Sequence, residues 1–262
     1  MREVLSRRVT AAVLLVGAVL GAPGTALADH TGDVPHVEPC VYGAIGDRYA
    51  SLGGSAGFLG QAVTCEAPTT YRPGRFNDFQ GGSIYWSSDT GAWEVHGRIR
   101  DKWVELGQEG GPLGFPVANE AQLVDGASSQ FEGGLISWSP ETDAHEVRGA
   151  ILDVWAVTGL EGGSLGYPLS DETPTPLLPG RYNHFEDGSV YWSPTTGAYA
   201  VTGDIRDLWA SLGWENSYLG FPTSAEYPLR DGRRRQDFQG GNITWSPTGG
   251  GPATLQPAAT AA

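Results

Sequence analysis

The strongest constraint on the fold is an internal repeat, because one short phrase occurs four times. "GGSIYWSS" at residues 81–88 returns as "GGLISWSP" at 133–140, "DGSVYWSP" at 187–194 and "GGNITWSP" at 240–247. The four tryptophans are spaced by 52, 54 and 53 residues. Self-similarity at such a period is typical of repeat architectures, in which each copy needs its neighbours to cover its apolar face. The sequence therefore predicts four tandem copies of one unit.

Each copy combines a helical pattern with a strand pattern. "GRIRDKWVELG" places Ile99, Trp103 and Leu106 on one helical face, and a glycine ends the segment. The following "RFNDFQGGSIYWSSDTGAWEVHG" contains three short strand patterns separated by turns. We expect a mainly β fold with short helices, built from a helix and a three-stranded meander per copy. The predicted repeat domain spans residues 41–250, with copies at about 43–96, 97–148, 149–202 and 203–250.

The two ends of this domain predict a closed arrangement. Each helical pattern follows a strand that ends V-x-G, and "CVYGAI" at residues 40–45 matches this junction. The last copy stops where its final strand is due. A segment that begins at Val41 would then complete the last copy and close a propeller-like ring, which leaves no open sheet edge. An open solenoid is the alternative, and residues 251–262 are predicted to be a disordered tail.

The central strand of each copy predicts which side chains are buried. Alternation places Ile84 and Trp86 on one face and Tyr85 on the other. The first face keeps its chemistry in every copy, which favours a core role for the tryptophan. Tyr85 and Tyr191 lie on the variable face and form a weak candidate set for ligand binding.

The N-terminus indicates export. Three arginines precede an apolar run over residues 9–22, and Ala-Leu-Ala follows at 26–28. This is the pattern of a secretory signal peptide at 1–28, followed by a lead segment at 29–40, so we expect a secreted or wall-associated protein. No later segment reaches the roughly 20 apolar residues of a membrane span. Without residues 1–28, which hold three arginines and one glutamate, the net charge falls from −14 to −16. Such a charge argues against binding to nucleic acid or anionic lipid.

The two cysteines, Cys40 and Cys65, both lie in the exported part. In an oxidising compartment we expect them to form a disulfide. A metal site is less favoured, because no histidine-rich spacing accompanies them. We expect no cofactor.

The repeated motifs resemble the LGFP repeat family of actinobacterial cell-envelope proteins. "LGFP" occurs at 113–116 and 219–222, "LGYP" at 165–168, and each is followed by the Trp-containing phrase described above. The resemblance covers residues 41 to about 248, although the first copy has "LGQA" instead of the tetrapeptide. In that family the repeats are thought to hold proteins at the cell wall, through wall polysaccharide such as arabinogalactan. The resemblance implies a compartment and a role but supplies no binding residue.

Carbohydrate binding requires aromatic faces for sugar rings and polar groups for hydroxyls. Two repeat positions offer these groups, and packing between copies or bonding to local backbone is the alternative role for both. The aromatic position holds Trp93, His145 and Tyr199, and the acidic position holds Glu66, Glu120, Glu172 and Glu226.

A hydrolase is the competing class, because "GGSAG" around Ser55 and "GGSLG" around Ser164 fit the nucleophile pattern G-x-S-x-G. Neither serine recurs in the other copies or follows a strand in the required order. Histidines likewise share no common repeat position that would favour acid-base or metal chemistry. We therefore expect a nonenzymatic protein that binds wall polysaccharide, such as arabinogalactan or a peptidoglycan-linked glycan. The alternatives are a scaffold for protein partners such as envelope enzymes, and a secreted esterase.

Overall fold

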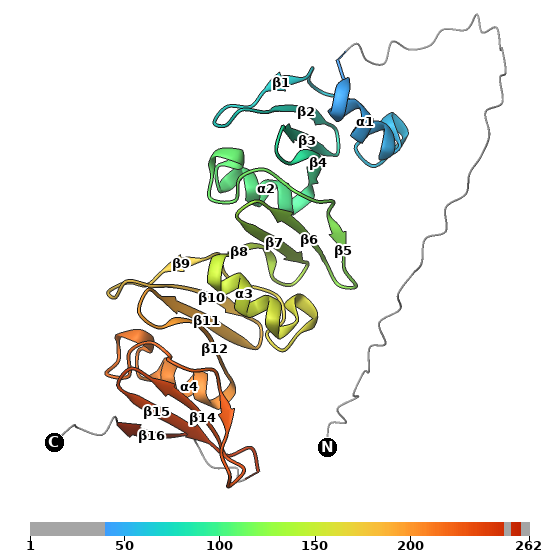
Figure 1. Cartoon of the computed structure of the whole chain (residues 1–262). Helices are drawn as coiled ribbons and strands as arrows, with labels where there is room; N and C mark the ends of the chain where they lie inside the picture. The colour runs from blue at the N-terminus through green and yellow to red at the C-terminus, as the bar shows by residue number, and fades with distance from the viewer. Residues whose placement is uncertain (1–39, 249–252, 258–262) are drawn as a thin grey trace, which may run out of the picture. The chain divides into compact units, whose positions relative to one another are not determined.

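The computed structural model describes residues 40–248 and 253–257 (Figure 1). Within them lie four antiparallel sheets of four strands and four α-helices, which confirms the mainly β repeat fold. The helices are α1 (Gly43–Ser51), α2 (Gly97–Glu105), α3 (Gly149–Thr158) and α4 (Gly203–Ser211). The predicted signal peptide at 1–28 and the lead segment up to residue 39 lie outside the described residues.

Each sheet follows chain order, so every strand pairs with the next one along the sequence. The first sheet holds β1 (Ala67–Pro68), β2 (Arg75–Phe79), β3 (Gly82–Ser87) and β4 (Gly91–His96). The second holds β5 (Ala121–Gln122), β6 (Ala127–Phe131), β7 (Gly134–Ser139) and β8 (Asp143–Arg148). The third holds β9 (Thr173–Pro174), β10 (Arg181–Phe185), β11 (Gly188–Ser193) and β12 (Gly197–Thr202). The fourth holds β13 (Tyr227–Pro228), β14 (Arg234–Phe238), β15 (Gly241–Trp245) and β16 (Thr254–Pro257). The meander was predicted; the first strand of each sheet was not, because two residues show no alternation.

The helices bury the face that the sequence pattern predicts. Ile99 is 2% exposed and Trp103 is fully buried. The indole Nε1 of Trp103 donates a hydrogen bond to the carbonyl of Gly114, at 3.0 Å, and Trp155 does the same to Gly166 at 3.1 Å. In copies two and three the helix tryptophan therefore fixes the backbone of the Leu-Gly turn, whereas the buried indole N–H of Trp209 in copy four has no hydrogen-bond partner among the described residues.

The Leu-Gly turn requires glycine for two reasons. Gly114 has a φ of +69°, which side-chain-bearing residues rarely adopt. A Cβ atom there would also lie 2.2 Å from Oε2 of Glu132. This carboxylate accepts a hydrogen bond from the backbone N–H of Phe115 at 2.8 Å. Glu132, which follows Phe131 at the end of β6, thus holds the Leu-Gly turn in place.

The first three sheets each contact two helices, which corrects the prediction for the repeated tryptophan. The first sheet contacts α1 on one side and α2 on the other. Ile84 is fully buried and Tyr85 is 3% exposed, since Tyr85 packs edge-on against Trp103 with ring centroids 4.6 Å apart. Trp86 is only half-buried. The variable face is therefore core, and the repeated tryptophan lies at the surface end of its strand.

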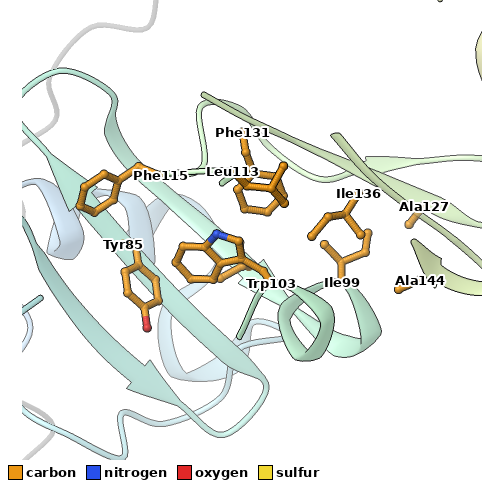
Figure 2. Packing of buried hydrophobic residues seen from close by; sticks show 10 residues of the cluster. Tyr85, Ile99, Trp103, Leu113, Phe115, Ala127, Phe131, Ile136 and Ala144 are labelled. Carbon is orange, nitrogen blue, oxygen red and sulfur yellow. The ribbon is translucent and has the colours of Figure 1, made fainter. Parts of the chain in front are cut away.

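The core crosses from one copy to the next, as the repeat pattern predicts. Figure 2 shows Trp103 of copy two between Tyr85 of copy one and Phe131 of its own sheet. Phe115 also reaches copy one, where a Cβ on Gly74 would lie 2.6 Å from its ring. The aromatic ring of each LGFP or LGYP motif therefore fits only because the residue it packs against in the preceding copy is a glycine.

A side-chain amide joins successive copies through their backbones. Asn183 Nδ2 donates to the carbonyl of Glu146 in β8, at 2.9 Å, and to that of Ser170 at 2.8 Å. Gln236 makes the equivalent bond to Ala200 in β12, at 2.8 Å. We call these side chains, together with Asn77, the amide clamps. Asn77 bonds the carbonyl of Cys40 at 3.3 Å, which places the segment before α1 where a preceding copy has its last strand.

The closing strand differs from the prediction. The outer partner of β15 is β16, not a segment from the N-terminus, and Leu255 lies opposite Ile243. Residues 254–257 of the predicted disordered tail therefore form a strand. No pairing joins the first and fourth sheets within the described ranges, so ring closure is not confirmed. The sequence did not predict this strand, because a glycine-rich stretch precedes β16 and because β16 lacks the V-x-G ending of the other final strands.

The predicted disulfide is confirmed: Cys40 and Cys65 are bonded, with Cα atoms 4.5 Å apart. It joins the segment before α1 to the segment before β1. Backbone N–H of Glu66 also donates to the carbonyl of Cys40 at 3.1 Å. The first copy thus fixes its entry segment covalently.

Candidate binding pockets

A pocket recurs at the same place in the first three copies. It is bounded by the residue before the helix, the first glycine and the isoleucine of that helix, the glutamate after the Leu-Gly turn, and the repeated tryptophan. We call these the Trp-Glu pockets, and their volumes are about 200, 290 and 400 Å³ in copies one, two and three. Their lining residues include Tyr42, Gly43, Ile45, Glu66 and Trp86 in copy one, His96, Gly97, Ile99, Glu120 and Trp138 in copy two, and Arg148, Gly149, Ile151, Glu172 and Trp192 in copy three.

Sheet register brings these side chains together. The first residue of the second strand lies directly opposite the tryptophan, as in Arg75 opposite Trp86. The neighbour of Trp86 on its other side is Ala92, which is too small to cover an indole. The short first strand then places Glu66, one residue before it, at the same end of the sheet.

The glutamates form the buried floor of the pockets. The side chains of Glu66, Glu120 and Glu172 are only 7%, 6% and 6% exposed. Burial of a carboxylate is costly unless a charge or hydrogen-bond donor accompanies it. The partners differ between copies, so the three pockets are not chemically equivalent.

Copies one and three supply arginine to the glutamate. Arg75 forms an ion pair with Glu66. Glu172 lies between two guanidinium groups, with Arg148 Nη2 at 3.1 Å and Arg181 Nε at 3.3 Å. Because these arginines are partly exposed, each pocket has a buried acceptor and a donor at its rim.

Copy two lacks this arginine, since Ala127 occupies its position opposite Trp138. Glu120 instead contacts His96 Nε2 at 3.2 Å and accepts a hydrogen bond from Gln122 Nε2 at 2.9 Å. Burial raises the pKa of Glu120 to about 7, and burial also lowers the pKa of His96. Near neutral pH this glutamate can both donate and accept hydrogen bonds.

Copy four has the same residues in the same positions. Glu226 pairs with Arg234, which lies opposite the half-buried Trp245. Thr202, the residue before α4, has its hydroxyl 3.4 Å from Glu226 Oε2. The glutamates predicted from the sequence therefore lie beside the repeated tryptophans in all four copies.

The predicted aromatic position lies elsewhere and lines none of the three Trp-Glu pockets. Trp93 pairs across the sheet with Tyr85, and the Arg48 guanidinium lies 5.3 Å from its ring centroid. His145 Nδ1 contacts Asp171 at 3.1 Å. Tyr199 is half-buried beside Tyr191. His145 thus contacts a side chain of the next copy, which matches the alternative of packing between copies, whereas Trp93 and Arg48 belong to the same copy.

The two serines of the G-x-S-x-G patterns lie in turns. Ser55 belongs to a 3₁₀ segment at Gly54–Ala56, and Ser164 follows another at Leu160–Gly162. In the described part of the chain, no group of three or more His, Cys, Asp or Glu side chains is placed to hold a metal ion. None of the helices in these residues is long and apolar enough to cross a membrane.

Similar units that share apolar cores across their junctions define a tandem-repeat protein. The sequence model of the LGFP repeat matches at residues 59–111, 113–163, 165–217 and 219–258. These matches cover most of the chain, which therefore belongs to the LGFP repeat family. Each of the first three runs from a Leu-Gly turn through its sheet to the helix of the next copy, the segment that spans one junction. A comparison with curated proteins found no match.

Sequence reasoning missed the tryptophans of the pockets and the residues before each helix. The signal for the tryptophans was present, because the phrase that carries them is the most regular part of the repeat. Alternation assigned them to the core, since it assumes that one strand face is solvent-exposed. In this sheet both faces are covered, and exposure varies along the strand instead.

Proposed function

We propose that this protein is a nonenzymatic, cell-wall-associated repeat protein that binds envelope polysaccharide through its Trp-Glu pockets. The observation that carries the proposal is the recurrence of a half-buried indole beside a buried carboxylate in copies one, two and three, with the same pair of residue types partly buried in copy four. A sugar ring offers an apolar face to an aromatic ring and hydroxyl groups to charged or amide side chains. The signal pattern supports export, and the family supports a role at the wall with arabinogalactan or a peptidoglycan-linked glycan as the proposed ligand.

Repetition supports polymer binding over a single catalytic centre. Each pocket is small, with a volume of about 200, 290 or 400 Å³, so we expect each to bind a single sugar weakly. Several weak sites on one chain bind a polymer much more tightly than any one site binds a monomer. A polysaccharide supplies the matching repetition in the ligand.

The test is co-sedimentation of the full exported chain with purified, deproteinised actinobacterial cell wall. We expect binding that soluble arabinogalactan competes away. The triple variant Trp86→Leu, Trp138→Leu, Trp192→Leu should lose most of it. Tyr218→Ala, which changes a side chain that is 57% exposed and outside the pockets, is the matched control.

A second triple variant, Glu66→Gln, Glu120→Gln, Glu172→Gln, covers the case in which loss of three indoles unfolds the chain. It keeps the size of each side chain and should also weaken binding. Failure of the unmodified protein to bind any deproteinised wall fraction would overturn the proposal. Binding that disappears when wall proteins are stripped would favour the scaffold for protein partners.

A further inference from the structure

The junction between copies one and two contains a cavity that differs from the Trp-Glu pockets. It has a volume of about 150 Å³ and lies between the first sheet and the segment after α2. Phe76 and Tyr85 form its aromatic wall. Its polar wall consists of Asp78, Arg100, Gln108 and Glu109.

The equivalent space between copies three and four is filled by a side chain. Trp214 occupies the repeat position of Gln108, and both residues have a left-handed backbone with φ of 59° and 54°. The Trp214 ring stacks on Tyr191, with centroids 5.7 Å apart, and the Arg206 guanidinium lies 5.4 Å from its centroid. Tyr191 and Arg206 correspond to Tyr85 and Arg100. The filled junction therefore shows that a flat ring fits between this tyrosine and this arginine.

The polar lining changes together with the occupant. Where Trp214 fills the space, His184 stands at the position of Asp78 and contacts the indole, with ring centroids 5.5 Å apart. Where the space is open, a carboxylate and an amide replace the two rings. A lining of carboxylate, guanidinium and amide groups suits a ring that carries hydroxyl groups.

Donors and acceptors in the open junction are held in position. Arg100 donates from Nε to Ser83 Oγ at 2.7 Å and from Nη2 to Asp78 Oδ1 at 3.1 Å, which leaves the Nη1 hydrogens for a ligand. Gln108 Nε2 donates to the Tyr85 hydroxyl at 3.0 Å, so the phenol hydrogen can be donated elsewhere. Glu109 is fixed by the backbone N–H groups of Thr70 and Tyr71, at 3.0 and 2.9 Å.

We propose that this junction is a second carbohydrate site, which takes a single sugar ring in the space that Trp214 fills between copies three and four. The ring rests against the wall formed by Phe76 and Tyr85, and its hydroxyl groups bond to Arg100, Asp78 and Gln108. The ligand class rests on the proposed function, but the site is separate from the Trp-Glu pockets. A cavity of about 150 Å³ accommodates a six-membered ring.

The experiment is a titration of the full exported chain with free D-arabinose and with free D-galactose, followed residue by residue by amide chemical shifts in NMR. We expect saturable shifts at Gln108 and its neighbours for at least one sugar. Gln108→Trp should fold, because Trp214 already adopts this backbone, and should weaken the sugar at this junction by at least about tenfold, the equivalent of 1.4 kcal/mol. Arg100→Leu, which copies the residue at 152, should weaken it without filling the space.

Trp192→Leu, which changes a side chain packed on a core cluster that does not contain Tyr85, separates this site from the proposed function. It should leave the shifts at Gln108 unchanged while it reduces wall binding. The proposal is overturned if neither sugar shifts the junction residues, or if Gln108→Trp binds as the unmodified chain does. Shifts confined to residues of the Trp-Glu pockets would also overturn it and leave the proposed function standing.

Discussion

Single residues decide how the equivalent pockets differ. The glutamate is present in every copy, but its partners are arginines in copies one and three and a histidine with an amide in copy two. Burial raises the pKa of Glu172 although two guanidinium groups oppose the effect, whereas no guanidinium opposes it at Glu120, where burial raises the pKa to about 7. The repeat thus keeps one geometry and varies the electrostatics within it.

Glu120 makes this difference measurable as pH-dependent stability. Its pKa of about 7 exceeds that of the unfolded chain, so the folded protein binds the proton more tightly. The stability contributed in this way is complete below about pH 4.5 and is lost as pH rises through about 7. We expect Glu120→Gln to remove this loss, so that its unfolding free energy relative to the unmodified chain rises by roughly 2 kcal/mol between these pH values. Urea unfolding at each pH measures it, and a constant difference would contradict the assignment.

Two glycines with similar φ values differ in the space around them. Gly97 has a φ of +54° and no atom within 4 Å of an added Cβ, whereas a Cβ on Gly114 meets the carboxylate of Glu132. Gly97→Ala should cost about 1–2 kcal/mol, the left-handed penalty alone. Gly114→Ala should cost about 1–3 kcal/mol more, because the turn must also move. Thermal unfolding of both variants tests the order, and equal losses would show that the turn adapts freely.

At this scale the sequence identified the recurrent acidic position but not the tryptophans that lie beside it. Glu66 and its equivalents recur at one offset from the Leu-Gly turn, and the sheet register brings them beside the tryptophans. Trp86 was assigned to the core, because a repeated aromatic residue in a strand is usually buried. Its exposure depends on the size of Ala92 beside it and on the end of the covering helix, which alternation does not report.

At the scale of elements, the helices and the longer strands could be predicted from the sequence, whereas the shortest strands could not. The helices and the meanders carry several periodic residues each, so their existence follows from the sequence. The two-residue strands such as β1 and the four-residue β16 carry too few. They form because an adjacent strand offers unpaired backbone groups, a property of the assembled sheet.

The disulfide stabilises the segment that leads into α1, by joining it to the segment before β1. The bridge joins residues 25 apart, and in the chain-entropy account it contributes about 3 kcal/mol. We expect Cys40→Ser with Cys65→Ser to lower the unfolding free energy by about this amount, measured by urea denaturation without reductant. Reductant should cause a similar loss in the unmodified chain and no further loss in the variant. Unchanged unfolding in the variant would mean that the hydrogen bonds to Cys40 suffice.

At the scale of the whole molecule, copy one differs from the others at positions that elsewhere contact a preceding copy. Gln61 replaces the LGFP aromatic ring, which in copy two packs against Gly74. Ser55 stands where Glu109 bonds the backbone of copy one. The apparent nucleophile motif and the degraded tetrapeptide thus have the same structural explanation. These differences favour the open alternative over the closed ring.

Because cores cross the junctions, damage in one copy should spread to its neighbour. Phe115→Ala removes a ring of copy two that packs on copy one and should cost about 3–5 kcal/mol. Hydrogen exchange should then accelerate in β2 and β3 as well as in β6 and β7. Tyr218→Ala, at an exposed position, should change neither region. Faster exchange restricted to copy two would show that the copies fold independently.

The amide clamps have a consequence for a ligand longer than one ring. Asn183 and Gln236 each tie the backbone of one copy to the last strand of the copy before it, which favours a fixed interval between the sites of copies two, three and four. A chain of sugars whose periodicity matches that fixed interval can occupy neighbouring sites at once, whereas a mismatched chain must occupy them singly. The protein would then select polysaccharides by the spacing of their sugar units as well as by their composition.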